Sequence, residues 1–395
     1  MLLRVGIRKI RRLEFMTPSW FHPGMKAGAH CRGGWPSLIR ILIVCGGALI
    51  WMHLEALGAT NSTFTGTANP DAMPDAKAIM KYLRALPLRQ DRKLISGQFE
   101  SWGPAVLPLS DPSNNLAVVH RKTGKWVGLV GVEYHAGAVY PDRPNQLCIE
   151  YWKKGGLVQI YLIMRNPASP DASNGGGKCD IDLVLKPAHE YHRYFFHELD
   201  EIAAALAVLQ TNGVIVFLNP FAEETGDWFW WGDQSPEEFK RLYRSTFDYL
   251  VKSNRLNNLL FVFEPGSSSP RGAAYYPGDD YVDMVGISTF VSWNQELTPS
   301  QIPAYASLLR LGKPMALSQW GPRRGRDQVG KDEPPGDNLK LLRGIEKHFP
   351  QITWWMNWNM AYAISSPENS NAHDEELLRD PRVINLGDLN WKAER

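Results

Sequence analysis

The sequence predicts an α/β fold, a closed (β/α)8 barrel, on the basis of three observations. From Asp75 onward, short apolar runs alternate with helical patterns, and eight such runs occur. Runs that are apolar throughout are typical of strands buried on both faces, as in a parallel sheet covered by helices. Eight such strands in about 320 residues fit one closed barrel. The eight runs are residues 94–97, 127–133, 157–164, 214–218, 259–263, 284–287, 315–318 and 352–356.

The segments between the runs carry helix signals of their own. Residues 235–238 have the form of a capping box with proline at the first helical position, and residues 298–301 repeat it. Asp337 is expected to cap a third helix, which Pro350 stops. Apolar residues spaced three and four apart predict a helix with one buried face, which Gly213 ends: Phe195, Leu199, Ile202, Leu206 and Leu209.

Residues 1–59 are expected to be an export segment. A basic stretch precedes an apolar run at 41–52, which is shorter than the roughly 18 residues that span a bilayer. Small residues at 56–59 favour a cleavable signal peptide, and the alternative is an uncleaved anchor through residues 41–52. The protein is therefore expected to be periplasmic or secreted, with membrane contact only through this segment. Translation could also begin at Met25.

The rest of the chain is expected to be a linker, residues 60–77, followed by a single barrel domain, residues 78–395. Beyond the export segment two cysteines remain, Cys148 and Cys179. In an oxidising compartment they could form a disulfide that closes a loop of about 30 residues. The alternative is two free, buried thiols.

Composition narrows the class of partner. The chain has 395 residues and a formal net charge of +2, which is too small a surplus to indicate a nucleic-acid partner. It contains no C-x-x-C pair, no P-loop and no G-x-G-x-x-G after a strand. No metal and no other cofactor is predicted.

Residues 219–232 are the most informative stretch for function. They follow an apolar run and combine two adjacent carboxylates with a cluster of tryptophans. Indole faces stack on the C–H faces of sugar rings, and carboxyl groups act on glycosidic oxygens, so the pattern favours carbohydrate chemistry. The alternative is a packed aromatic corner. The residues are Glu223, Glu224, Trp228, Trp230 and Trp231.

Other polar and aromatic residues follow the remaining runs. Active sites of such barrels lie at the carboxyl ends of the strands, so these residues are expected to share one end of the barrel with Glu223. They are Glu133, Glu264, Gln319 with Trp320, and Trp358.

Five stretches in order make the chain resemble glycoside hydrolase family 26, the β-mannanases and related endo-β-glycanases, over roughly residues 78 to 390. Residues 219–232 are similar to the family motif R-P-F-H-E-M-N-G followed by W-F-W-W-G. The other stretches are G-G-L-V at 155–158, N-N-L-L-F-V-F at 257–263, Y-Y-P-G-D-D-Y-V-D-M-V-G at 275–286 and K-P-M-A-L-S-Q-W-G at 313–321.

The resemblance implies a retaining mechanism, in which one glutamate protonates the leaving oxygen and another attacks the anomeric carbon. The motif places the proton donor at Glu223 and the nucleophile at Gln319, where a neutral amide replaces the carboxylate. A substrate surface of aromatic residues is also implied: Trp228, Trp230, Trp231, Trp320, Trp355, Trp358 and Phe290. Further departures from the family pattern are Asn219, Ala222, Ile163, Ser288 and Phe290.

Two functions remain open. One is an active glycosidase acting on a β-linked polysaccharide, with Glu223 as the acid and Glu264, Glu133 or Glu224 as the base for an inverting attack by water. The other is a catalytically inactive polysaccharide-binding protein of an exopolysaccharide system, since an amide at Gln319 cannot act as the family's nucleophile.

Overall fold

The computed structural model describes residues 66–395 apart from 136–140, 172–174, 293–294, 324–335 and 366–370. The expected export segment, 1–59, and the start of the expected linker lie outside the described residues. The linker prediction is wrong for residues 66–77, because Ala68 and Ala76 are buried and a helix begins at Pro74. The Ala68 N–H donates to Asp283 Oδ1 at 2.7 Å, which fixes this segment to the barrel.

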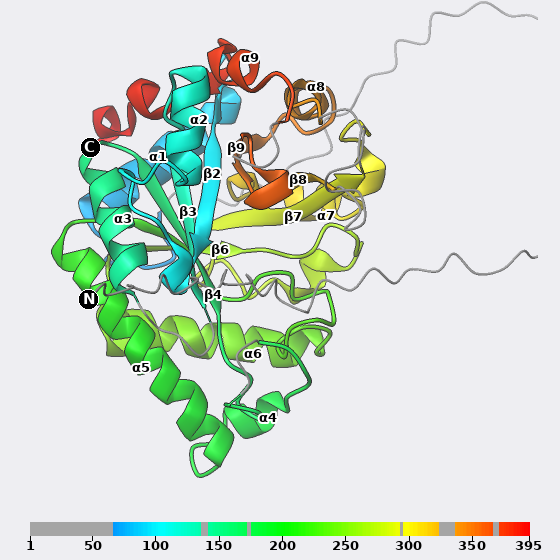
Figure 1. The fold of residues 1–395 in the computed structure, drawn as a ribbon. Coiled ribbons are helices and arrows are strands. Elements are labelled where there is room, and N and C mark those ends of the chain that lie inside the picture. Colours follow the sequence, from blue (N-terminus) through cyan, green and yellow to red (C-terminus); the bar gives the residue numbers. More distant parts are fainter. Residues whose placement is uncertain (1–65, 136–140, 172–174, 293–294, 324–335, 366–370) are drawn as a thin grey trace, which may run out of the picture. The chain divides into compact units, whose positions relative to one another are not determined.

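Eight parallel strands form the predicted closed barrel (Figure 1). The ring closes where the last strand pairs with the first, with Asn357 opposite Gln98. Two-residue strands β1 (Leu94–Ile95) and β10 (Val383–Ile384) extend the sheet beside the closure. The barrel strands are β2 (Gly97–Trp102), β3 (Leu129–His135), β4 (Leu157–Ile163), β5 (Val216–Asn219), β6 (Leu259–Phe263), β7 (Met284–Ser292), β8 (Met315–Arg323) and β9 (Ile352–Asn357).

Helices alternate with the strands along the chain and lie around the barrel (Figure 1). Within the described ranges no helix is both long and apolar enough to cross a membrane. The α-helices are α1 (Pro74–Ala85), α2 (Asn115–Thr123), α3 (Asp142–Lys153), α4 (Ile181–Val184), α5 (Glu190–Thr211), α6 (Pro236–Phe247), α7 (Tyr305–Leu309), α8 (Leu339–His348) and α9 (Asp374–Arg379).

Helix α1 closes the amino end of the barrel. Its Ile79 and Leu83 belong to one core cluster with Leu129, Leu157 and Met284, which are the first residues of β3, β4 and β7. The carboxyl ends of the strands are therefore the end available for a site.

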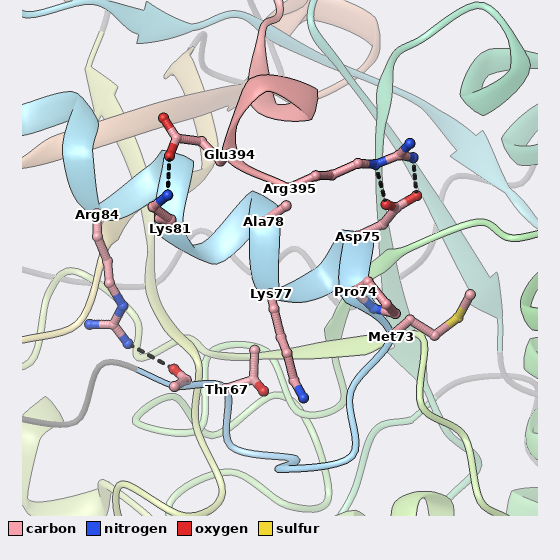
Figure 2. A pocket seen from close by; sticks show the side chains of 11 residues that line it. Thr67, Met73, Pro74, Asp75, Lys77, Ala78, Lys81, Arg84, Glu394 and Arg395 are labelled. Atoms are coloured by element: carbon pink, nitrogen blue, oxygen red, sulfur yellow. Dashed lines mark hydrogen bonds and ion pairs between the residues drawn. The ribbon is translucent and has the colours of Figure 1, made fainter.

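The outer side of α1 is tied to the last residues of the chain, as Figure 2 shows. Lys81 Nζ lies 2.9 Å from Glu394 Oε2, and the Arg395 guanidinium makes two hydrogen bonds to the Asp75 carboxylate, at 2.7 and 2.8 Å. These groups line a cavity of about 1000 Å³ that contains none of the site residues expected from the sequence.

The structure confirms most of the helix features predicted from the sequence. The apolar face expected between residues 195 and 209 is buried on α5, and Gly213 follows with a φ of +71°, which only glycine adopts without strain. Ser235 and Glu238 form the predicted capping box of α6. The box at Thr298 is also present, but it starts a 3-10 helix of three residues, Pro299–Gln301.

Two other expectations need correction. The cap of α8 is Asn338, although Asp337 Oδ1 does accept the Leu339 N–H at 2.9 Å from one position earlier. Cys148 and Cys179 are both free and buried, so the disulfide alternative is wrong. Burial raises the pKa of both thiols, to about 11 for Cys179, which keeps them protonated.

Candidate active site

Glu223 stands on a turn that leaves the carboxyl end of β5. Its backbone has a φ of +57°, in the left-handed region, which costs a non-glycine residue on the order of 1–3 kcal/mol. The turn is fixed from both sides, because the Glu223 N–H donates to Glu264 O at 2.8 Å and Glu223 O accepts the Gly226 N–H at 2.9 Å. The strained residue is thus held in place by the neighbouring strand β6.

Glu223 is partly exposed as a residue, and its carboxyl group accepts two side-chain hydrogen bonds. The Trp228 indole N–H donates to Oε2 at 2.8 Å, and the Ser288 hydroxyl donates to Oε1 from β7. Burial raises the pKa of Glu223, and the two donors oppose that rise without cancelling it. The group is therefore oriented and holds its proton more tightly than an ordinary glutamate.

Gln319 lies on β8, directly opposite Ser288 of β7 in the strand register. Its Nε2 donates to Glu264 Oε1 at 2.6 Å, and the neighbouring Ser318 hydroxyl donates to the other oxygen of the same carboxyl group. Glu264 is fully buried. Burial is the main cause that raises the pKa of Glu264 to about 8. The hydrogen bond from Ser318 opposes this rise, and the charge of Glu223 adds to it.

Two more carboxyl groups lie at this end of the barrel. Glu133 of β3 is hydrogen-bonded to His135, with 2.6 Å between Glu133 Oε1 and His135 Nδ1. Glu224 is fully buried, and within the described residues neither of its carboxyl oxygens has a hydrogen-bond partner. Burial is the main cause that raises the pKa of Glu224 well above the usual range, and the charges of Glu264 and Glu223 add to the rise.

Tyr161 connects these groups. It is buried on β4 opposite Glu133, and its hydroxyl donates to Ser318 O on β8, across the barrel. After burial, the charges of Glu264, Glu133 and Glu223 raise the pKa of the phenol. The structure thus brings Glu133, Glu223 and Glu264 into one electrostatic environment around Tyr161.

Three of the expected sugar-stacking residues need correction. Trp230, Trp231 and Trp355 are fully buried, so no ring face is available to a ligand. Each indole N–H is satisfied inside the protein, by Met164 O at 3.1 Å, by Ala222 O at 2.9 Å and by Asn357 Oδ1 at 2.9 Å. For these tryptophans the packed aromatic corner is correct.

The remaining expected aromatic residues are more accessible. Trp228 and Phe290 are partly exposed, and Phe290 packs edge-on against Tyr362 with ring centroids 5.0 Å apart. Trp320 and Trp358 retain 4% and 8% exposure, so only a rim of each ring reaches the surface. One face of Trp358 is covered by Phe99, whose ring centroid lies 3.8 Å away.

Several residues of this region were missed from the sequence. Ser288 was noted only as a departure from the family pattern, yet it is one of the two donors to Glu223. Glu100, a buried carboxyl at the end of β2, was missed because the apolar run stops at Gly97 while the strand continues to Trp102. The alternation Glu133, His135 along β3 could have indicated that both side chains point to one face.

No group of three or more histidine, cysteine or acidic side chains suited to a metal ion occurs among the residues that the structure describes. Carboxyl, amide and hydroxyl groups at this end of the barrel can transfer protons and stabilise charge electrostatically.

Comparisons with known proteins point to one family. The family model for glycosyl hydrolase family 26 matches residues 68–388. A mannan endo-1,4-beta-mannosidase of Bacillus subtilis is 27% identical over 374 residues, covering 90% of this chain and 98% of that protein. The mannan endo-1,4-beta-mannosidase A and B of Caldalkalibacillus mannanilyticus is 27% identical over 367 residues, covering 87% of this chain and 65% of that protein.

Among solved structures, the Bacillus subtilis mannanase man26 superposes with a TM-score of 0.69 at 25% sequence identity. That match covers 82% of this chain and 95% of the mannanase. The shared barrel therefore extends over nearly the whole of the described domain.

Proposed function

The chain belongs to glycosyl hydrolase family 26, and from this premise we propose that it acts on a β-linked polysaccharide with Glu223 as the proton donor. β-1,4-Mannan is the first substrate to consider, because the curated relatives over most of the chain are mannan endo-1,4-beta-mannosidases. The observation that supports the proposal is the Glu223 carboxyl group, held by Trp228 and Ser288 and buried enough to raise its pKa.

In this proposal Glu223 gives its proton to the glycosidic oxygen as the bond from that oxygen to the anomeric carbon breaks. The leaving sugar departs as an alcohol. The anomeric carbon gains positive charge, which the carboxylate formed on Glu223 stabilises electrostatically.

A covalent glycosyl intermediate at position 319 is not part of the proposal, because the Gln319 amide is a poor nucleophile. Instead, the oxygen of a water molecule bonds to the anomeric carbon on the opposite face, and a second carboxylate takes the proton from that water. Glu264, Glu133 and Glu224 are the candidates for this second carboxylate. This route inverts the anomeric configuration.

A second function is supported by a specific observation. Glu264 and Glu224 are fully buried and Glu133 nearly so, which leaves little room for a water molecule at any of them. A chain with this site and Gln319 could bind a polysaccharide in the inherited cleft without cutting it. Such a polysaccharide-binding protein would serve an exopolysaccharide system.

The test is to incubate the full chain with β-mannan, mixed-linkage glucan, xylan and bacterial exopolysaccharides while both reducing ends and binding are measured. Release of reducing ends from one polysaccharide supports the proposed hydrolysis. Tight binding without release supports the binding function in its place. If no polysaccharide is bound or cut, both functions are wrong.

We also propose that residues 1–59 direct export, on the basis of the basic stretch and the apolar run at 41–52. Expression in a bacterium followed by fractionation tests this. The proposal expects a periplasmic or secreted form whose N-terminus lies near Ala59, or a membrane-bound form if the segment is uncleaved. Full-length protein found only in the cytoplasm would contradict it.

A further inference from the structure

Glu264 and Gln319 are joined in a way that bears on the missing nucleophile. Gln319 Nε2 lies 2.6 Å from Glu264 Oε1. Glutamine and glutamate have the same shape, so Nε2 marks the place where a glutamate at position 319 would carry a carboxylate oxygen. The Glu264 carboxyl therefore lies one hydrogen bond away from the position that the family uses for its nucleophile.

The Glu264 carboxyl is firmly held there. The Ser318 hydroxyl donates to its second oxygen, and the backbone of Glu264 pairs with Ala222 and accepts the Glu223 N–H at 2.8 Å. Glu264 is 0% exposed and Gln319 is 7% exposed. Gln319 is therefore the more accessible of the two residues, and its amide presents Nε2 to Glu264.

The two groups complement each other electrostatically. Two carboxylates at this separation cannot both ionise, as in paired aspartates that share one proton. A carboxyl at 264 therefore requires a neutral donor at 319, and Gln319 supplies one. The same pair would be equally complementary with the two groups exchanged.

We propose that Glu264 is a positioning residue for Gln319, and that the pair keeps a carboxyl group on the residue that follows β6 in place of one on β8. This inference rests on the proposed function. By accepting the Nε2–H at 2.6 Å, the Glu264 carboxyl polarises the Gln319 amide, so that the amide carbonyl oxygen gains negative charge. That oxygen stabilises the positive anomeric carbon while Glu223 donates its proton, and no bond to Gln319 forms.

The first test is a double-mutant cycle on stability: wild type, Glu264→Gln, Gln319→Glu and the exchange variant carrying both. The melting temperature is measured from about pH 5 to about pH 9. Gln319→Glu brings two carboxyls together, so its melting temperature is expected to fall with rising pH more steeply than that of the wild type. The exchange variant is expected to recover the wild-type profile. Additive effects of the two substitutions would overturn the inference.

The second test measures hydrolysis of manno-oligosaccharides and the anomer of the first product by NMR. In the exchange variant a carboxylate at position 319 attacks the anomeric carbon as Glu223 protonates the leaving oxygen, and water then cleaves this ester while returning a proton to Glu223. We expect retained configuration and turnover at least roughly tenfold above the wild type. In Glu264→Gln, kcat should fall while oligosaccharide binding is unchanged.

If Gln319→Glu alone matches the exchange variant in turnover and in its melting profile, the pair is not coupled and the inference is wrong. If Gln319→Glu does not fold and the exchange variant does, the coupling is supported. Absence of binding and hydrolysis in all four proteins contradicts the proposed function instead, and the melting cycle then still decides the coupling by itself.

Discussion

At the scale of single residues, Glu223 combines a strained backbone, partial burial and two hydrogen-bond donors. Its position could be predicted because the motif and the end of an apolar run coincide at residues 219–223. The hydrogen-bond partners of its carboxyl group could not be predicted in this way. Ser288 is 65 residues further along the chain, and only the closure of the barrel brings β7 beside the turn after β5.

The hydrogen bond from the Trp228 indole to Glu223 can be tested by substitution. A hydrogen bond to a carboxylate favours the charged form, so replacing Trp228 by phenylalanine should raise the pKa of Glu223 further. Because the proton donor must be protonated, the alkaline limb of the kcat/KM profile is expected to move to higher pH. Ser288→Ala should move it in the same direction, since it removes the other donor.

The control is Trp152→Phe, which changes a tryptophan on α3 that stacks on Trp391, with ring centroids 5.4 Å apart and without contact to Glu223. Its pH profile should match that of the wild type. A profile that Trp228→Phe and Ser288→Ala leave unchanged, in proteins that fold normally, would contradict the role given to Glu223.

The tryptophans show where residue patterns were insufficient. The sequence places Trp228, Trp230 and Trp231 within four positions, a pattern that favours a binding surface and has a packed corner as its alternative. The choice is made by packing, because Phe195 of α5 and Phe221 both lie edge-on to the Trp230 ring. A single sequence does not reveal which rings a distant helix will cover.

At the scale of elements, apolar runs located all eight barrel strands but not their full lengths. Strands β7 and β8 continue five residues beyond the runs, to Ser292 and Arg323, through segments in which polar and apolar residues are mixed. A register shift between Gly286 and Ser288 then sets Ser288 opposite Gln319. The Ser288–Gln319 part of the site was therefore harder to predict than the fold, because it lies on these extensions.

The capping boxes at Ser235 and Thr298 are expected to stabilise the fold to different extents. In α6 the Ser235 hydroxyl accepts the Glu238 N–H at 3.3 Å, and the Glu238 carboxylate accepts the Ser235 N–H at 3.1 Å. Ser235→Ala should lower the free energy of unfolding by about 1 kcal/mol, measured by urea titration. Thr298→Ala removes a similar box from a 3-10 helix of three residues and should cost less. An equal or larger loss for Thr298→Ala would contradict this account.

At the scale of the whole molecule, the described domain keeps several carboxyl groups buried and protonated. Burial is the first cause in each case, and it raises the pKa of Glu100 to about 8, of Glu198 to about 7 and of Glu264 to about 8. A carboxyl whose pKa is raised on folding adds no cost while both states are protonated. It destabilises the fold progressively as the pH rises through the unfolded value toward the folded one.

Stability should therefore fall between about pH 4.5 and about pH 8. Glu100 is a suitable residue for the test, because its carboxyl accepts the backbone N–H of Asn115 at 2.6 Å and an amide can keep that bond. Glu100→Gln should flatten the dependence of the free energy of unfolding on pH, by up to a few kcal/mol across this interval. A variant with the same slope as the wild type would show that Glu100 is not protonated in the fold.

The proton on Glu223 is the centre of the proposed function, and Glu223→Gln tests it most directly. Wild type, Glu223→Gln and the control Glu198→Gln, which replaces a buried glutamate of α5, are compared on manno-oligosaccharides for turnover and binding. We expect the wild type to hydrolyse the oligosaccharides and Glu223→Gln to do so roughly 100-fold or more slowly while still binding them. Glu198→Gln should remain active. Equal turnover in Glu223→Gln, or binding without turnover in the wild type, would contradict it.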